Sequence, residues 1–211
     1  MLTGGARSMS SLPFSEACER NKDPILVVLR EVFADRSKVL EIGSGTGQHA
    51  VHFAAGLSHL AWQPTELPDS LLAVQVRRGE ARLANLLAPL ALDVNQLQWP
   101  DIDADAVFTA NTLHIVSWLE VISIFERVGR LLPSGGVLVA YGPFRYDNSH
   151  TSESNAQFDL MLRSRDPSSG IRDFEALNEL ASEHKLIWSG DWAMPANNRT
   201  LVWRKARVES I

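Results

Sequence analysis

The stretch that decides the fold is Val39-Leu40-Glu41-Ile42-Gly43-Ser44-Gly45-Thr46-Gly47-Gln48-His49, an apolar run that ends in three glycines spaced two apart. A helical pattern follows this run. Glycines let the backbone adopt positive φ and let a ligand approach the main chain, and the amides at the start of a helix face that ligand. The stretch therefore predicts a strand, a tight loop and a helix, with a nucleotide-like ligand at the loop.

The spacing of the glycines separates two classes of ligand. The dinucleotide fingerprint G-x-G-x-x-G requires a third glycine at position 48, where the chain has Gln48. Residues 41–47 read E-I-G-S-G-T-G instead, which resembles the first motif of class I methyltransferases that use S-adenosylmethionine. By that resemblance the cofactor, whose product is S-adenosylhomocysteine, is bound by Glu41, Gly43, Ser44, Gly45 and Gly47.

Composition narrows the class of protein. The chain has 211 residues, 45% hydrophobic and 21% charged, and we expect one domain at 13–205 between a leader at 1–12 and a tail at 206–211. A net charge of −5 without a Lys/Arg-rich run argues against a nucleic-acid partner. A single cysteine, Cys18, excludes a disulfide framework and thiolate-rich metal sites, so we expect no metal. No apolar run is long enough for a membrane span, which predicts a cytoplasmic protein.

Two acidic residues follow predicted strands at positions suited to a nucleoside. Residues 59–64 read as a strand leading to Glu66, and a carboxylate there can accept hydrogen bonds from both ribose hydroxyls. The alternative is that Glu66 helps to start the next helix near Asp69. Residues 90–94 read as a further strand, and the methyltransferase resemblance implies that Asp93 and Val94 hold the adenine.

Residues 105–111 form an apolar run typical of a central strand that is buried on both faces of a parallel sheet. The residues at its end fall where the methyltransferase resemblance places the transferable methyl group, which adds Asn111 and Leu113 to the predicted cofactor contacts. The proline pair of enzymes that methylate base amino groups is missing there. This argues against a nucleic-acid base as the acceptor.

His114 is the first candidate for a general base, because the ordinary pKa of histidine suits proton removal near neutrality. Tyr146 is the second catalytic candidate. A lone histidine is more often a structural residue that makes hydrogen bonds, and that alternative stays open.

A polar segment at 143–172 interrupts the alternation of strands and helices, and we expect it to cover the acceptor at the edge of the sheet. The candidate substrate-binding residues are His49, Arg145, Asn155, Asp159 and Arg172. Guanidinium groups can bind a carboxylate or phosphate, whereas ion pairing with the interleaved acidic residues is the alternative. Asn155 and Asp159 are one helical turn apart and are expected to face the pocket together.

Helix signals complete the pattern. Asp23-Pro24 reads as an N-cap followed by the first helical residue, and the methyltransferase resemblance implies that the segment before it, with Asn21, forms a lid over the cofactor within residues 13–35. Asp69 is expected to cap the helix after the second strand. Ser117-Trp118-Leu119-Glu120 is a capping box that opens a helix ending near 133–136, before a strand at 137–142.

The last two predicted strands, at 186–192 and 200–204, have no helix between them and must pair as a hairpin. The last strand then runs antiparallel to the others. The fold class that this predicts is α/β and Rossmann-like, a seven-stranded mostly parallel sheet with an antiparallel last strand and helices on both faces. A dinucleotide-binding fold continues instead with strand-helix units.

The methyltransferase resemblance covers residues 13–205, and it narrows at 18–22 (C-E-R-N-K), 41–49 and 194–198 (M-P-A-N-N) to the uncharacterised methyltransferase-like protein 26 family. It implies an enzyme that transfers a methyl group from S-adenosylmethionine to a small-molecule acceptor, which the family does not identify. Two alternatives stay open: a non-catalytic protein that binds or senses S-adenosylmethionine, and a nicotinamide-dependent oxidoreductase.

Overall fold

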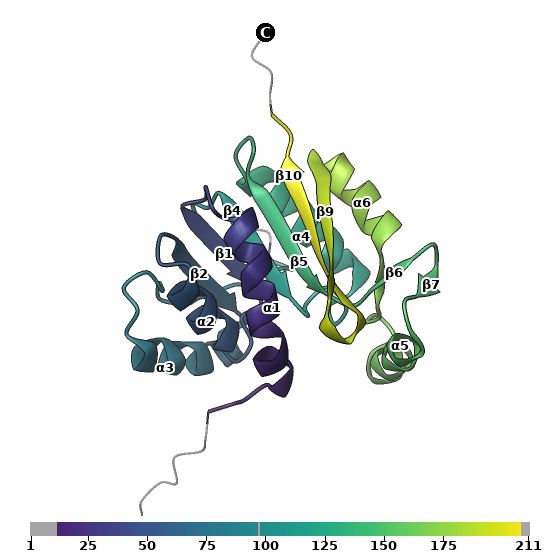
Figure 1. Ribbon diagram of the computed structural model, residues 1–211, viewed down its shortest axis with the longest axis horizontal. Helices are drawn as coiled ribbons and strands as arrows, with labels where there is room; N and C mark the ends of the chain where they lie inside the picture. Colours follow the sequence, from purple (N-terminus) through teal and green to yellow (C-terminus); the bar gives the residue numbers. More distant parts are fainter. Residues whose placement is uncertain (1–11, 97, 208–211) are drawn as a thin grey trace, which may run out of the picture.

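Strand β1 (Lys38–Ile42) is the third strand of a seven-stranded sheet with the order β3-β2-β1-β4-β5-β10-β9. A computed structural model describes residues 12–96 and 98–207 of the chain (Figure 1). The other strands of this sheet are β2 (Ala61–Glu66), β3 (Leu90–Ala91), β4 (Ala106–Ala110), β5 (Val137–Gly142), β9 (Leu186–Met194) and β10 (Asn198–Lys205). Only β10 runs antiparallel to its neighbours β5 and β9, so the predicted fold class is confirmed.

Strand β5 shows why the sheet is covered on both faces. All six of its residues are buried, and successive side chains point to opposite faces. Leu138 and Ala140 join one hydrophobic core, whereas Val139 and Tyr141 join the other. An apolar strand without polar alternation therefore requires helices on either side.

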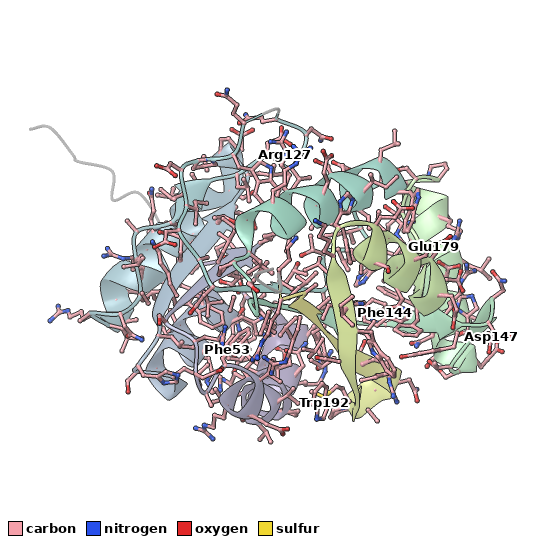
Figure 2. The ribbon with its side chains drawn as sticks, turned by 90° about the horizontal axis from the view of Figure 1, so that it is seen from above. Phe53, Arg127, Phe144, Asp147, Glu179 and Trp192 are labelled. Atoms are coloured by element: carbon pink, nitrogen blue, oxygen red, sulfur yellow. The ribbon has the colours of Figure 1, made fainter. Side chains whose placement is uncertain are left out.

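Helices fill both of these layers. On one face α1 (Glu16–Val32) and α2 (Gln48–Gly56) pack around Phe53, and on the other α4 (Trp118–Leu131) and α6 (Phe174–Glu183) share a core with Phe144 (Figure 2). The 3₁₀ turn η1 (Pro68–Ser70) and α3 (Leu71–Ala81) connect β2 to β3. The expected three-layer arrangement is thus present.

The polar insertion carries a second sheet that the sequence did not predict. Its strands β6 (Phe144–Tyr146), β7 (Ser149–His150) and β8 (Arg172–Asp173) have the order β7-β6-β8 in the sheet. Along the chain, α5 (Glu153–Arg165) connects β7 to β8. Two of these strands have two residues each. Such strands are too short for the alternation that reveals a strand in a sequence.

Three element boundaries differ from the expectation. Helix α1 begins at Glu16, because the Ser15 side chain caps it by accepting a hydrogen bond from the Cys18 N–H, and Pro24 lies inside the helix. A proline there removes one backbone hydrogen bond, which a 17-residue helix with a buried face tolerates. Asp69 lies in η1 and does not cap α3. Strand β3 has two residues, although the predicted capping box of Ser117 and Glu120 is present on α4.

The predicted leader (1–12) and tail (206–211) fall mostly outside the described residues, so the domain boundaries stay a prediction. Within residues 12–96 and 98–207, no helix is both long enough and apolar enough to cross a membrane. The same residues contain no group of three or more histidine, cysteine or acidic side chains that could hold a metal ion.

Candidate functional site

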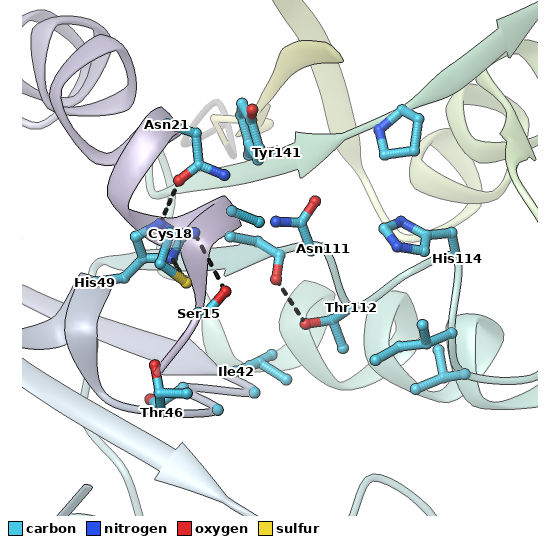
Figure 3. A pocket seen from close by; sticks show the side chains of 18 of the residues that line it. Ser15, Cys18, Asn21, Ile42, Thr46, His49, Asn111, Thr112, His114 and Tyr141 are labelled. Atoms are coloured by element: carbon cyan, nitrogen blue, oxygen red, sulfur yellow. Dashed lines mark hydrogen bonds between the residues drawn. The ribbon is translucent and has the colours of Figure 1, made fainter. Parts of the chain in front are cut away.

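A cavity of about 980 Å³ lies where β1, β2, β4 and β5 end (Figure 3). The carboxyl ends of parallel strands meet at one edge of a sheet, which is where open α/β sheets bind ligands. Eleven of the predicted site residues line this cavity: Asn21, Gly43, Ser44, Gly45, His49, Glu66, Asp93, Val94, Asn111, His114 and Asn155.

The glycine loop after β1 forms part of the cavity wall with its main chain. Gly43 has a φ of 74°, and a Cβ at this position would lie 2.7 Å from Oγ1 of Thr112. Both the backbone conformation and the lack of space therefore exclude a side chain here. The Ser44 N–H donates to the carbonyl of Thr65 at 2.9 Å, which ties the loop to the end of β2.

Glu41 supports the loop from inside the protein and does not itself line the cavity. Its carboxyl group is buried, and Oε2 accepts hydrogen bonds from Ser44 Oγ at 2.7 Å and from Trp62 Nε1 at 3.1 Å. Burial raises the pKa of Glu41 from 4.5 to about 7, although the two hydrogen bonds oppose this change. The residue therefore links the loop to β1 and β2.

Two carboxylates line the cavity where β2 and β3 lead into their loops. Glu66 accepts hydrogen bonds from the N–H of Gly45 at 2.5 Å and of Leu67 at 2.8 Å. Asp93 accepts one from the N–H of Asn95 at 2.9 Å. A carboxylate has about four lone-pair sites, so both groups keep capacity to accept hydrogen bonds from a ligand.

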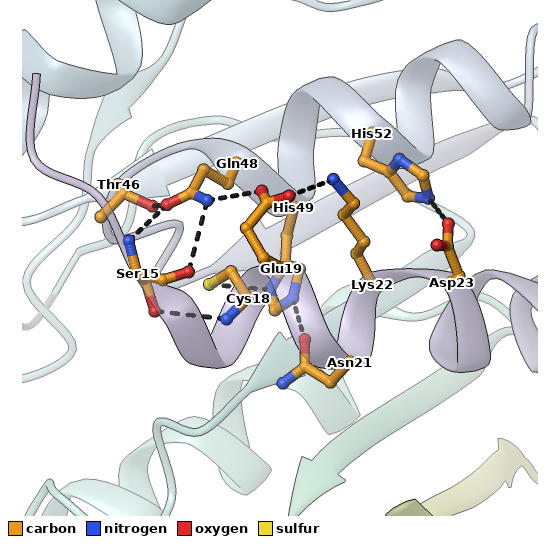
Figure 4. Close-up of polar contacts among 10 residues, drawn as sticks. All are labelled: Ser15, Cys18, Glu19, Asn21, Lys22, Asp23, Thr46, Gln48, His49 and His52. Carbon is orange, nitrogen blue, oxygen red and sulfur yellow. Dashed lines mark hydrogen bonds and ion pairs between the residues drawn. The ribbon is translucent and has the colours of Figure 1, made fainter.

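The start of α1 closes one side of the cavity and is held there by Gln48 of α2 (Figure 4). Oε1 of Gln48 accepts from the Ser15 N–H at 2.7 Å, and Nε2 donates to Oε1 of Glu19 at 2.7 Å. Gln48 is buried by these contacts. The side chain that breaks the dinucleotide fingerprint is thus the one that joins the N-terminal segment to the helix after the glycine loop.

A second set of contacts joins α1 to α2 through His49. Its Nε2 lies 2.6 Å from Oδ1 of Asn21, and its Nδ1 lies 3.9 Å from Sγ of Cys18. Because an amide oxygen only accepts, Nε2 carries the proton and Nδ1 faces the thiol as an acceptor. Burial lowers the pKa of His49 to about 4 and raises the pKa of the Cys18 thiol, so both groups are neutral at pH 7.

The other end of the cavity is built around His114, Asn111 and Gly142. Asn111 has a φ of 57°, a conformation that asparagine adopts more readily than most residues, and its N–H donates to the Tyr141 carbonyl. A Cβ on Gly142 would lie 3.5 Å from His114 Nδ1 and 3.9 Å from Asn111 Oδ1. The missing side chain at Gly142 therefore leaves a small space that both polar groups border.

His114 is buried and neutral. Burial is the main reason that its pKa is lowered to about 4, and the nearby positive charge of Arg172 adds to this. Its ring packs edge-on against Phe158 of α5, with centroids 5.4 Å apart. Neither ring nitrogen has a hydrogen-bond partner among residues 12–96 and 98–207. The imidazole is therefore free to accept a proton from a ligand.

Helix α5 and the turn between β9 and β10, which contains η2 (Pro195–Asn197), form the outer wall. Asn155 and Phe158 line the cavity from α5, and Ala196 and Asn198 line it from the turn. Helix α5 of the insertion thus covers the His114 end of the cavity, and its role as a cover for the acceptor stays a prediction.

Two candidates from the insertion do not reach the cavity. Arg145 forms an ion pair with Asp173, and the Tyr146 hydroxyl donates to Oδ2 of Asp191 at 2.8 Å. Burial, followed by the adjacent Asp191 carboxylate, raises the pKa of Tyr146. Neither residue lines the cavity, so the structure does not support Tyr146 as a catalytic residue or Arg145 as a substrate-binding residue.

Three other predicted residues also point elsewhere. Arg172 is buried, and its Nε donates to the carbonyl of Leu113 at 2.9 Å. Neither Arg172 nor Leu113 lines the cavity. Asp159 accepts from the Ile171 N–H at 2.6 Å and pairs with Arg163 at 3.0 Å. The expectation that Asn155 and Asp159 face the cavity together is wrong, because Asp159 instead holds the segment after α5. Ion pairing, the alternative interpretation, describes Arg145 and Asp159, whereas Arg172 donates to backbone carbonyl groups.

Several residues of the lining were not singled out from the sequence: Ser15, Arg20, Thr112, Tyr141 and Phe158. A signal existed for Tyr141, because it lies at the carboxyl end of a correctly predicted strand. Ser15 and Phe158 carried no comparable signal, since each comes into place through packing of segments distant in the chain.

A family model described as "Protein of unknown function (DUF938)" matches residues 12–205. Solved structures with a similar fold include an O-methyltransferase family protein from Burkholderia thailandensis, with a TM-score of 0.78, 18% identity, and coverage of 89% of this chain and 57% of the other. The S-adenosylmethionine-dependent methyltransferase SibL, in its apo form, gives a TM-score of 0.77 and 20% identity over 90% of this chain and 56% of the other.

An O-methyltransferase family 2 protein from Planctomyces limnophilus DSM 3776, in complex with apigenin, gives a TM-score of 0.72 and 16% identity over 88% of this chain and 62% of the other. The chain therefore spans somewhat more than half the length of these solved structures. At such identities the similarity establishes a shared fold. The narrower resemblance to the methyltransferase-like protein 26 family stays a prediction.

Proposed function

The chain belongs to the family described as "Protein of unknown function (DUF938)", and we propose that it is an S-adenosylmethionine-dependent methyltransferase that acts on a small-molecule acceptor. The observation that carries this proposal is the convergence of three features in one cavity. These are the glycine loop, the carboxylates of Glu66 and Asp93, and the neutral imidazole of His114, whose ring nitrogens have no partner among the described residues.

The residues present fit this cofactor. Glu66 offers carboxylate oxygens for ribose hydroxyls, and Asp93 with Val94 borders the place for adenine. The main chain at Gly45 leaves room for the methionine part, because a Cβ there would meet no atom within 4 Å. The volume of about 980 Å³ is at the upper end of the range of about 300–1,000 Å³ that is usual for ligand pockets, which leaves space for an acceptor as well.

When bound, S-adenosylmethionine supplies a methyl group that its sulfonium already activates. The protein then has to align the acceptor, exclude water and remove a proton. His114 can accept this proton from a hydroxyl group, since its ring is neutral at pH 7 and has no competing protein partner among the described residues. Asn111 borders the same space above Gly142 and can orient the reacting group.

A small molecule is the acceptor that the site favours. The cavity end near His114 is covered by α5 and the β9–β10 turn, so a substrate must fit beneath them. The net charge of −5 disfavours a polyanionic substrate such as nucleic acid. A location in the cytoplasm stays a prediction.

The two alternatives make different demands on the site. A sensor of S-adenosylmethionine would need the cofactor end but not an unpartnered base at the far end. The dinucleotide fingerprint of a nicotinamide-dependent oxidoreductase would need a glycine at position 48 for close packing of the helix on the strand. The chain instead has the buried Gln48 side chain, which binds Ser15 and Glu19. Both are therefore less well supported than methyl transfer.

Calorimetry tests the cofactor assignment. We expect the wild-type protein to bind S-adenosylhomocysteine and to show no binding of NAD⁺ at the same concentration. Glu80→Gln, an exposed substitution on α3, serves as a control that leaves both results unchanged. Preferential binding of NAD⁺ would overturn the proposal.

A further inference from the structure

Asn155 lies in the first turn of α5, buried to 6% exposure, and lines the same cavity as His114. It is three residues before Phe158, which also lines the cavity and packs on the His114 ring. Residues three apart on a helix have Cβ atoms about 5–6 Å apart. Asn155 therefore lies one helical turn from the residue that packs on the proton acceptor, in the wall of the same cavity.

The orientation of the Asn155 amide is fixed by its neighbours. Nδ2 donates to the backbone carbonyl of Asn197 at 3.1 Å and to Oγ1 of Thr151 at 2.9 Å. A carbonyl oxygen only accepts, so the nitrogen must be the atom that faces Asn197. Both N–H groups are then used within the protein.

The oxygen of the same amide has no such partner. Within residues 12–96 and 98–207, no protein group donates a hydrogen bond to Oδ1 of Asn155. The atom belongs to an almost fully buried side chain that lines the cavity. An acceptor held in this way is satisfied only by water or by a donor on a ligand, and leaving it unsatisfied is costly.

We propose that Asn155 is a substrate-recognition residue that accepts a hydrogen bond from a second hydroxyl or amine group of the methyl acceptor. This inference rests on the proposed function for the place of the reacting hydroxyl, which lies between His114 and Asn111 above Gly142. The substrate class that it names is a compact compound with two hydrogen-bond donors, of which one is methylated and the other is recognised.

The surrounding wall agrees with a flat, uncharged body for this compound. Phe158, Pro143 and Pro195 present apolar rings to the cavity. Of the charged residues in the described lining, Glu66 and Asp93 belong to the cofactor end, Glu120 caps α4, and Arg20 is exposed. A flat ring with two polar substituents fits this distribution of groups.

Binding of simple diols to the complex of the protein with S-adenosylhomocysteine tests the inference. The probes are catechol, resorcinol and hydroquinone, each compared with its monomethyl ether, which keeps one hydroxyl and loses the second donor. For at least one isomer we expect the wild-type complex to bind the diol about tenfold more tightly than its ether, as measured by calorimetry.

Variants identify the residue responsible. Asn155→Leu keeps a similar shape without the oxygen and should bring the ratio of the two dissociation constants to about one. Thr151→Val removes one partner of Nδ2 but leaves Oδ1 in place, so it should keep the wild-type ratio. In both variants the affinity for S-adenosylhomocysteine should stay within about twofold of the wild-type value. If Asn155→Leu fails to fold, Asn155→Ala takes its place in the comparison.

The proposal is overturned if the wild-type complex binds no diol more tightly than its ether, if it binds none of the six compounds, or if the variants of Asn155 keep the ratio. Because binding is measured without methyl transfer, the two proposals can fail separately. A protein that discriminates diols through Asn155 but transfers no methyl group retains this inference and loses the proposed function. A protein that transfers methyl groups but does not discriminate between diols and their ethers retains the proposed function and loses this inference.

Discussion

Replacing the buried Glu41 by glutamine is expected to change how the stability of the ligand-free protein depends on pH. Only 2% of Glu41 is exposed, and its Oε2 accepts hydrogen bonds from Ser44 and Trp62. Burial raises the pKa of this carboxyl from 4.5 to about 7. Glutamine has the same shape and an oxygen that can accept the same two hydrogen bonds, but it carries no charge at any pH.

The sign and size of the effect follow from linkage. Below pH 4.5 the carboxyl is protonated in the folded and the unfolded chain, so it imposes no penalty. As the pH rises from 4.5 to about 7, the unfolded chain loses the proton first, and the folded state becomes progressively less favourable. A difference of about 2.5 pKa units at about 1.36 kcal/mol per unit gives a loss of about 3 kcal/mol, which is complete above pH 7.

Urea unfolding followed by tryptophan fluorescence between pH 4.5 and 8 measures this effect. We expect the free energy of unfolding of Glu41→Gln, relative to wild type, to rise by about 3 kcal/mol over that range. Ser44→Ala provides a second test in the opposite direction, because it removes a hydrogen bond that lowers the pKa of Glu41 and should extend the loss to higher pH. Equal pH dependence of Glu41→Gln and wild type would refute the reasoning.

Three further substitutions or conditions test the two ends of the cavity. Gly142→Ala adds a methyl group 3.5 Å from His114 Nδ1, which is an ordinary contact, so the variant should keep its affinity for S-adenosylhomocysteine. Its kcat/KM should fall at least about tenfold, because the methyl group fills the space proposed for the acceptor. An unchanged kcat/KM would show that the acceptor does not use this space. Asp93→Ala should weaken binding of S-adenosylhomocysteine in calorimetry by about 1.5–3 kcal/mol, and an unchanged dissociation constant would contradict the adenine assignment. The rate of methyl transfer should stay constant above about pH 5 and fall as the pH drops through about 4, because a protonated His114 cannot accept a proton. If the pH dependence of the rate in His114→Gln matches that of wild type, His114 is not the base.

The sequence predicted those parts of the fold that depend on local signals. The three glycines at 43–47, the fully apolar strand at 137–142 and the hairpin at 186–204 each have a pattern that only one local structure satisfies. Together with the other predicted strands, these elements were sufficient to predict a mostly parallel sheet with an antiparallel last strand, but not the order of its strands. The start of α1 was missed because the Asp23-Pro24 signal competed with a true cap at Ser15, which the sequence does not rank above it.

The candidate site divides in the same way. Residues at or shortly after the ends of strands, such as Glu66, Asp93 and His114, could be placed because the carboxyl ends of parallel strands converge. Most predicted residues of the insertion were misplaced, since the direction of their side chains depends on packing between distant segments; Asn155 is the exception among them. Asn155 faces the cavity through its contact with Asn197, whereas Asp159, one turn later, faces the segment after α5.

The central claim is that the protein transfers a methyl group to a small molecule. Incubation of the wild-type protein with methyl-labelled S-adenosylmethionine and a cell metabolite extract, followed by chromatography, tests it most directly. The account predicts a labelled small-molecule product with the wild-type protein, and a signal at least about a hundredfold lower with His114→Gln at equal affinity for S-adenosylhomocysteine. A wild-type protein that binds S-adenosylhomocysteine but labels nothing in any extract would contradict the account and favour a sensor.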